Sequence, residues 1–186
     1  MMQALQQRNL DREVYLWSDD NLSADYFWTS LSEADRELIA SYAMYSRVCC
    51  FKGFDPSSFS FNTMASPEEY DRQFERMGKL LGLGLDLYSY VTFTTAETSD
   101  LQLKMNRFID RLQGLDENLP LRTVPLKVEI FRPTASRLNS ERKSALENQF
   151  RVLEAWSGML EGRFSSRQRA ARICDVPLLN RVTHGA

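Results

Sequence analysis

The sequence predicts an α/β fold of four parallel strands alternating with helices, followed by a C-terminal helical extension. Four short runs of apolar and β-branched residues alternate along the chain with four longer stretches of helical periodicity. Such alternation is typical of a parallel sheet whose crossover connections are right-handed. The chain has 186 residues, which is enough for one domain with its own core and too few for two ordinary ones.

The predicted strands run into polar residues or carry them on one face. Residues 14–17 (VYLW) lead into a polar triplet, and residues 48–51 (VCCF) lead into Lys52. Residues 87–95 (LYSYVTFTT) are the richest in β-branched and aromatic side chains. In residues 124–131 (VPLKVEIF) apolar and charged residues alternate. This alternation predicts one polar face, turned toward solvent or toward a lumen.

Helical periodicity and capping residues predict the helices between these strands. Ser66 can cap the clearest helix, Pro67 suits its first turn, and Gly82 follows its last apolar residue. The predicted helices cover residues 32–46, 66–81, 99–112, 140–160 and, as a short piece, 166–174. We therefore expect residues 1–138 to form the strand-and-helix unit and residues 139–186 to form a C-terminal helical extension with a tail.

The order of the predicted elements points to part of a barrel. If the strands lie in the sheet in chain order, right-handed crossovers place every connecting helix on the same face. The other face is then bare unless the sheet curls into a barrel, and four strands are too few to close one. The fold class predicted is therefore a partial (β/α) barrel with a C-terminal helical extension.

The composition narrows the possible partners and the compartment. The formal net charge is −2, and the basic residues of the C-terminal third interleave with acidic ones, so we expect no nucleic-acid partner. No apolar run approaches the roughly 20 residues that span a bilayer, and the polar N-terminus lacks a signal-peptide core. Three cysteines, two of them adjacent, imply no disulfide framework. These features predict a cytoplasmic protein without membrane contact.

Polar residues at the predicted strand ends are the candidates for ligand binding, because ligands of parallel sheets bind at the carboxyl ends of the strands. These candidates are Asp19, Asp20, Asn21, Lys52, Thr92, Thr94 and Arg132. Their carboxylates, ammonium, hydroxyls and guanidinium suit a polar, zwitterionic or anionic ligand. The alternative is that they are ordinary solvated positions, since loops that follow strands are polar in any case.

The sequence contains no complete catalytic or metal-binding motif. His184, the only histidine, lies close to the C-terminal end, in a segment that we expect to fray. Cys49 and Cys50 lack the spacing of zinc or iron–sulfur ligands, so core packing is the favoured interpretation. We therefore predict no metal ligands, and the sequence leaves open whether the chain is an enzyme.

Several segments of the chain together resemble the later half of a radical S-adenosylmethionine (radical SAM) enzyme. They are the run RVCCFKGFDPSSFSFNT, the helix SPEEYDRQFERM, the strand LDLYSYVTFTT and the run FIDRLQGLDENLPLRTVPLKVEIFRPT. The resemblance covers roughly residues 11–137 and corresponds to strands three to six of a partial barrel of six βα units. In that family the barrel holds S-adenosylmethionine and a [4Fe–4S] cluster.

The resemblance also implies roles for the candidate residues. Asp19, Asp20 and Asn21 correspond to the end of the third barrel strand, Lys52 to the end of the fourth, Thr92 and Thr94 to the fifth, and Arg132 to the loop after the sixth. In the family such positions line the cofactor and substrate pocket. The C-x3-C-x2-C cluster loop and the GGEP-like segment belong to the first two strands and have no counterpart here, so we expect no cluster on this chain alone.

Two functions follow as expectations. In the first, the chain is the C-terminal portion of a radical SAM protein, inactive alone, which associates with a complementary N-terminal half or with itself. In the second, it is a non-catalytic α/β module that binds a ligand or a partner. An open reading frame upstream that encodes the two missing motifs would favour the first.

Overall fold

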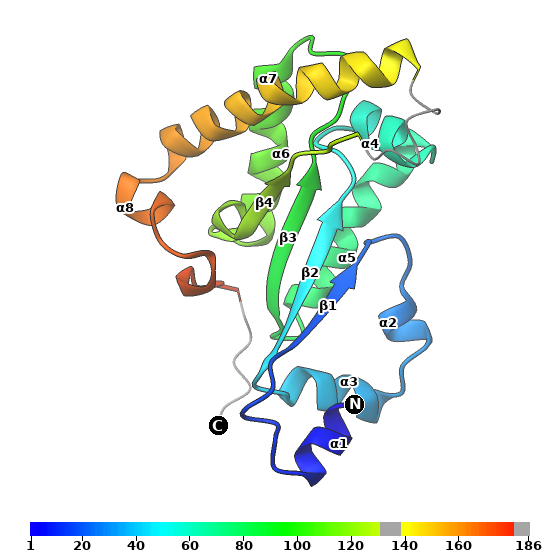
Figure 1. Cartoon of the computed structure of the whole chain (residues 1–186), viewed down its shortest axis with the longest axis vertical. Coiled ribbons are helices and arrows are strands. Elements are labelled where there is room, and N and C mark those ends of the chain that lie inside the picture. The colour runs from blue at the N-terminus through cyan, green and yellow to red at the C-terminus, as the bar shows by residue number, and fades with distance from the viewer. Residues whose placement is uncertain (131–138, 181–186) are drawn as a thin grey trace.

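The computed structural model describes residues 1–130 and 139–180 and contains one parallel sheet flanked by helices (Figure 1). The four strands are β1 (Leu16–Asp20), β2 (Tyr45–Phe51), β3 (Asp86–Thr92) and β4 (Thr123–Leu126). They lie side by side in chain order, and all three pairings are parallel. The predicted α/β class with four parallel strands alternating with helices is therefore confirmed.

Helices fill every connection between the strands. The helical elements are α1 (Met2–Gln7), α2 (Tyr26–Thr29), α3 (Glu33–Ser41), α4 (Pro56–Thr63), η1 (Pro67–Tyr70), α5 (Asp71–Leu81), α6 (Leu101–Leu115), η2 (Leu119–Arg122), α7 (Ser140–Arg163), α8 (Ser166–Arg169) and η4 (Ile173–Asp175). Among the helices that the structure describes, none combines the length and the apolar character needed to cross a membrane.

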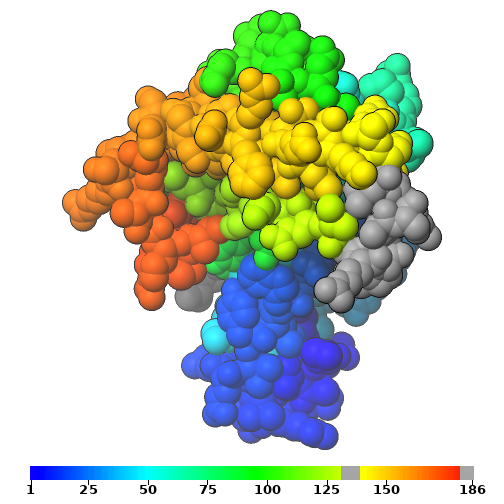
Figure 2. Space-filling view, turned by 45° about the horizontal axis from the view of Figure 1, so that its top comes forward, coloured from blue at the N-terminus to red at the C-terminus, as the bar shows by residue number. Residues whose placement is uncertain are grey.

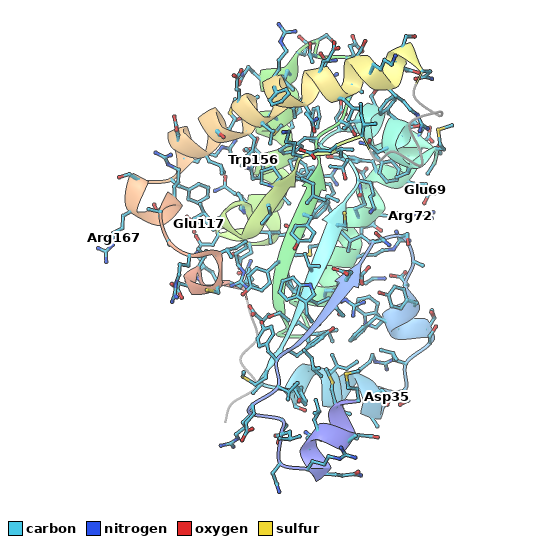
Figure 3. The ribbon with its side chains drawn as sticks, viewed as in Figure 1. Asp35, Glu69, Arg72, Glu117, Trp156 and Arg167 are labelled. Atoms are coloured by element: carbon cyan, nitrogen blue, oxygen red, sulfur yellow. The ribbon has the colours of Figure 1, made fainter. Side chains whose placement is uncertain are left out.

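The core lies between the sheet and the helices that cover one of its faces. Phe51 of β2 packs against Phe74 of α5 and Phe108 of α6, with ring centroids 4.9 and 5.9 Å apart. Trp156 of α7 reaches the same cluster, 6.1 Å from the Phe108 ring, and Figure 3 shows it beneath α7. The predicted C-terminal helix thus packs onto the core of the strand-and-helix unit.

Several predicted boundaries of the first helix and the first strand are wrong. The helix predicted over residues 32–46 ends at Ser41, and Tyr45 instead pairs with Leu16 in the sheet. β1 runs to Asp20, three residues beyond the predicted end of that strand. Aromatic residues near residue 45 suit a helix face and a strand equally, so periodicity alone could not separate the two.

The ends of four other predicted elements also differ from the structure. β3 ends at Thr92, and β4 ends at Leu126. The last residue of the fourth predicted strand, Phe131, lies outside the described residues. The helix predicted from Ser66 starts as the short 3-10 turn η1, and α7 continues through Gly162 to Arg163.

Helix α4 was not predicted at all. Its N-cap is Asp55, whose carboxylate accepts a hydrogen bond from the Ser58 amide at 2.8 Å. The Ser58 hydroxyl in turn accepts from the Asp55 amide, and Pro56 occupies the first turn. This capping box was a usable signal in the sequence, because serine can take the place of the more common glutamate.

Candidate functional site

Successive side chains along each strand point to opposite faces of the sheet. One face is covered by helices, and the other is called here the open face. Arg47, Cys49 and Phe51 of β2 point toward the helices, so Ser46, Val48 and Cys50 point the other way. The register then assigns to the open face Trp17, Asp19, Ser46, Val48, Cys50, Asp86, Tyr88, Tyr90, Thr92, Val124 and Leu126. Figure 1 views the sheet with α5 and α6 behind it.

The amino-terminal half of the open face is closed by a hydrogen-bonded network. Ser46 and Arg122 both donate to the Asp86 carboxylate, and Tyr88 donates to it at 3.2 Å. The Arg122 guanidinium lies 4.1 Å from the centre of the Tyr88 ring and also donates to the Val176 carbonyl at 2.6 Å. Burial, opposed by Arg122 and aided by Asp86, raises the pKa of the Tyr88 hydroxyl. This half of the face therefore has a structural role.

The carboxyl-terminal half of the open face is more accessible. Cys50, Tyr90 and Thr92 are partly exposed there, and Asp19 is exposed. Lys52 follows β2 on the same side, and its ammonium donates to the Cys50 sulfur at 3.2 Å. We call these five residues the rim cluster. They combine a cation, an anion, a thiol and hydroxyls at the strand ends, where parallel sheets bind their ligands.

Gln73 of α5 anchors the backbone beneath the rim cluster. Its buried side-chain oxygen accepts a hydrogen bond from the Lys52 amide at 2.7 Å, and its nitrogen donates to the Tyr70 carbonyl at 3.2 Å. The position of Lys52 therefore depends on the helix layer as well as on β2. Gln73 could not be identified from the sequence, because a polar residue on a helix gives no sign that it is buried.

Asp20 lies on the face opposite to the rim cluster. Its carboxylate pairs with Arg47 at 2.7 Å, and the two side chains are only 5% and 6% exposed. The same carboxylate accepts from the Leu22 amide at 2.8 Å, while Arg47 lies 5.2 Å from the Phe27 ring centre. Asp20 is thus held in a buried structural ion pair and lies apart from the rim cluster.

Thr94 is also engaged elsewhere. Its hydroxyl donates to the side-chain oxygen of Asn62, and the Asn62 amide nitrogen donates to the Thr94 carbonyl at 3.1 Å. This pair ties the loop after β3 to α4 and buries Thr94. Asn21 is exposed in the loop after β1, and Arg132 lies outside the described residues. Of the seven predicted residues, Asp19, Lys52 and Thr92 belong to the rim cluster.

The cysteines do not fit an iron–sulfur cluster. Cys49 and Cys50 point to opposite faces of β2, and Cys174 lines a pocket with Asp86 and Arg122 at the amino end of the sheet. Burial raises the pKa of the Cys49 thiol well above its ordinary value, which disfavours the thiolate that binds iron. Within residues 1–130 and 139–180, no group of three or more His, Cys, Asp or Glu side chains is placed to hold a metal ion.

A separate groove of about 860 Å³ opens beyond the ends of β2 and β3. Its lining includes Phe61 of α4, Met64, Glu97 of the loop after β3, and Arg142 of α7. None of the predicted site residues that the structure describes lines it. It was missed because α4, which forms one wall, was not predicted.

Comparisons of this chain with protein-family models, with curated proteins and with solved structures find no match.

Proposed function

We propose that this chain contributes the later strands of a radical SAM-type barrel and that the rim cluster forms part of its S-adenosylmethionine and substrate pocket. In this proposal the chain is inactive alone, and another polypeptide segment supplies the rest of the wall. The observation that carries the proposal is the layout of the sheet. Its strands follow chain order, helices cover one face, and the other face is closed at the amino end but accessible at the carboxyl end.

The chemistry of the rim cluster supports a zwitterionic ligand. The Lys52 ammonium suits a carboxylate, the Asp19 carboxylate suits an ammonium, and Thr92 can donate or accept a hydrogen bond. Tyr90 offers an aromatic surface on which a purine can stack. S-adenosylmethionine carries an α-carboxylate, an α-amino group, a sulfonium and an adenine. Its binding would therefore use the charged, hydroxyl and aromatic groups of the rim cluster.

The iron–sulfur cluster of the resembled family would have to be held outside this chain. In the family it supplies the electron that cleaves S-adenosylmethionine. Because the cysteines of this chain point in different directions, we assign them no part in holding it. The role proposed for the described residues is to bind and orient the ligand.

An NMR titration of the full chain with S-adenosylmethionine tests the proposal. We expect weak binding, with shifts concentrated at Lys52, Tyr90 and Thr92. A Lys52→Met variant should lower the affinity by about fivefold or more, because it removes the only cation of the rim cluster. Lys79→Met is the matched control, since Lys79 lies on the exposed surface of α5, where it pairs with Asp25. Shifts that avoid the rim cluster, or equal affinity in the Lys52 variant, would contradict the proposal.

The second candidate is a non-catalytic ligand-binding module. It is favoured by the finding that Asp20 and Thr94 serve structural contacts, which leaves fewer free groups for chemistry. S-adenosylhomocysteine, which lacks the sulfonium charge, separates the two in the same titration. Equal binding of S-adenosylhomocysteine, glutamate and S-adenosylmethionine would favour a general zwitterion-binding module. Selective binding of S-adenosylmethionine would favour the first function.

A further inference from the structure

We infer that the outer edge of β1 is a docking site for one added parallel strand with alternating apolar residues and a basic residue opposite Asp19. This inference rests on the proposed function, because it specifies how the rest of the wall attaches. Its test nevertheless requires no ligand. Three observations support it: the unpaired backbone of β1, the hydrogen-bonded main chain just beyond β4 at the opposite edge of the sheet, and a groove beside β1.

The outer backbone groups of β1 have no partner in the part of the chain that the structure describes. The Leu16 amide donates to the Met44 carbonyl at 2.7 Å, so the amide of this residue points toward β2. Because donors and acceptors alternate along a parallel ladder, the main-chain groups of Trp17 and Asp19 point away from β2. Such an exposed edge is a template for pairing with another strand.

At the opposite edge of the sheet, a side chain hydrogen-bonds the main chain. Just beyond β4, the Val128 amide donates to the side-chain oxygen of Gln149 on α7, and the Gln149 nitrogen donates to the Val128 carbonyl, both at 2.9 Å. Gln149 is only 3% exposed. Its amide thus takes the place of a neighbouring strand, and α7 covers this end of the sheet (Figure 1). Strand addition at Val128 would have to break both bonds.

A groove of about 490 Å³ runs along the helix-covered side of the β1 edge. Leu16, Leu31, Leu38 and Ile39 are among the residues that line it, and all four are only partly buried. On the other side of the edge, the Trp17 side chain is 47% exposed. In Figure 2 the blue N-terminal segment, which contains β1, forms part of the visible surface below α7. Apolar surface thus flanks the unpaired backbone on both sides.

The charges at this edge define the chemistry of the partner. Asp19 is exposed and has no ion-pair partner among the described residues. Asp35 of α3, labelled in Figure 3, lines the groove, whereas the nearby Arg47 is neutralised by Asp20. Met1 also lines the groove, so the acidic side of this edge is the open-face side, which carries Asp19. The strand that fits it carries apolar side chains toward the groove and a lysine or arginine beside Asp19, and a parallel direction matches the three existing pairings.

The test uses the full chain, labelled for NMR, and a capped peptide of about eight residues in which valine alternates with lysine or threonine. We expect the amide signals of Trp17 and Asp19 to shift and their hydrogen exchange to slow at millimolar peptide. An N-methylated peptide of the same sequence is the control, because it cannot form the main-chain bonds. An Asp19→Lys substitution should lower the affinity for the lysine-containing peptide by about fivefold. It should raise the affinity for a peptide with glutamate in place of lysine by a similar factor.

Three outcomes would overturn the inference. The first is the absence of shifts at Trp17 and Asp19, and the second is equal binding of the N-methylated peptide. The third is concentration-dependent self-association through β1 that excludes the peptide, which would make a second copy of this chain the occupant. Failure of the S-adenosylmethionine titration alone would count against the ligand and leave the edge pairing standing, so failure of one proposal can be distinguished from failure of the other.

Discussion

The Asp20 carboxylate and the Arg47 guanidinium form a buried ion pair 2.7 Å apart, while Asp19, the preceding residue, lies exposed on the other face of the sheet. Two adjacent acidic residues thus have different roles. Alternation along β1 turns one toward the helix layer and the other toward the open face. This contrast permits a direct comparison of two neighbouring substitutions.

An Asp20→Asn substitution should lower the free energy of unfolding by about 3–5 kcal/mol, because it leaves the Arg47 charge buried without its partner. Asp19→Asn should change it by less than about 0.5 kcal/mol, since this carboxylate is exposed. Urea unfolding followed by circular dichroism measures both. Similar effects of the two substitutions would show that the buried pair adds little to stability.

The buried Cys49 thiol should make the protein less stable as the pH rises from about 8 to about 10. Its pKa in the folded state is raised by burial, whereas the thiol of the unfolded chain ionises near its ordinary value of about 8.5. Above that value the unfolded state loses a proton that the folded state keeps, so the free energy of unfolding falls by up to about 1.4 kcal/mol per pH unit.

A Cys49→Ala variant should therefore lose less stability over this pH range than the parent protein. Cys50→Ala is the matched control for removing a thiol from β2. Urea unfolding at several pH values provides the measurement. An identical slope in the Cys49 variant would assign the effect to other groups.

Anaerobic reconstitution with iron and sulfide should leave the isolated chain without a stoichiometric [4Fe–4S] cluster. Several thiolates must converge on the irons of such a cluster. Cys49 and Cys50 face opposite sides of β2, and Cys174 lies toward the amino end of the sheet. Iron analysis and visible absorbance check the result. One cluster per monomer, lost in a Cys50→Ala variant, would sink this prediction.

A Gln149→Leu substitution should destabilise the protein by about 1–3 kcal/mol, because it leaves the amide and the carbonyl of Val128 without partners. It should also expose unpaired main-chain groups just beyond β4 and promote self-association, which light scattering can detect. Phe150→Gln, at the neighbouring exposed position on α7, is the control and should change neither property. A monomeric Gln149 variant of unchanged stability would contradict the assigned role.

Local patterns determined the order of the elements. Apolar runs, helical periodicity and residues such as Ser66 and Pro67 are short-range signals, so strand and helix alternation could be predicted, and with it a parallel sheet in chain order. Three of the five residues of the rim cluster, Asp19, Lys52 and Thr92, were among the predicted site residues. The capping box that begins at Asp55 was also readable in principle, although the helix it starts was missed.

The face of the sheet that each polar residue occupies depends on strand register and on long-range contacts. A shift of one residue in a strand moves a side chain to the opposite face, and the predicted first strand stopped three residues before Asp20. Asp20 pairs with Arg47, and Thr94 pairs with Asn62. Both pairs join residues far apart in the chain, so no local sequence pattern predicts them. Local sequence patterns were enough to predict the sheet and the helices of this protein. The contacts between the layers decided which of its polar groups remain free to bind.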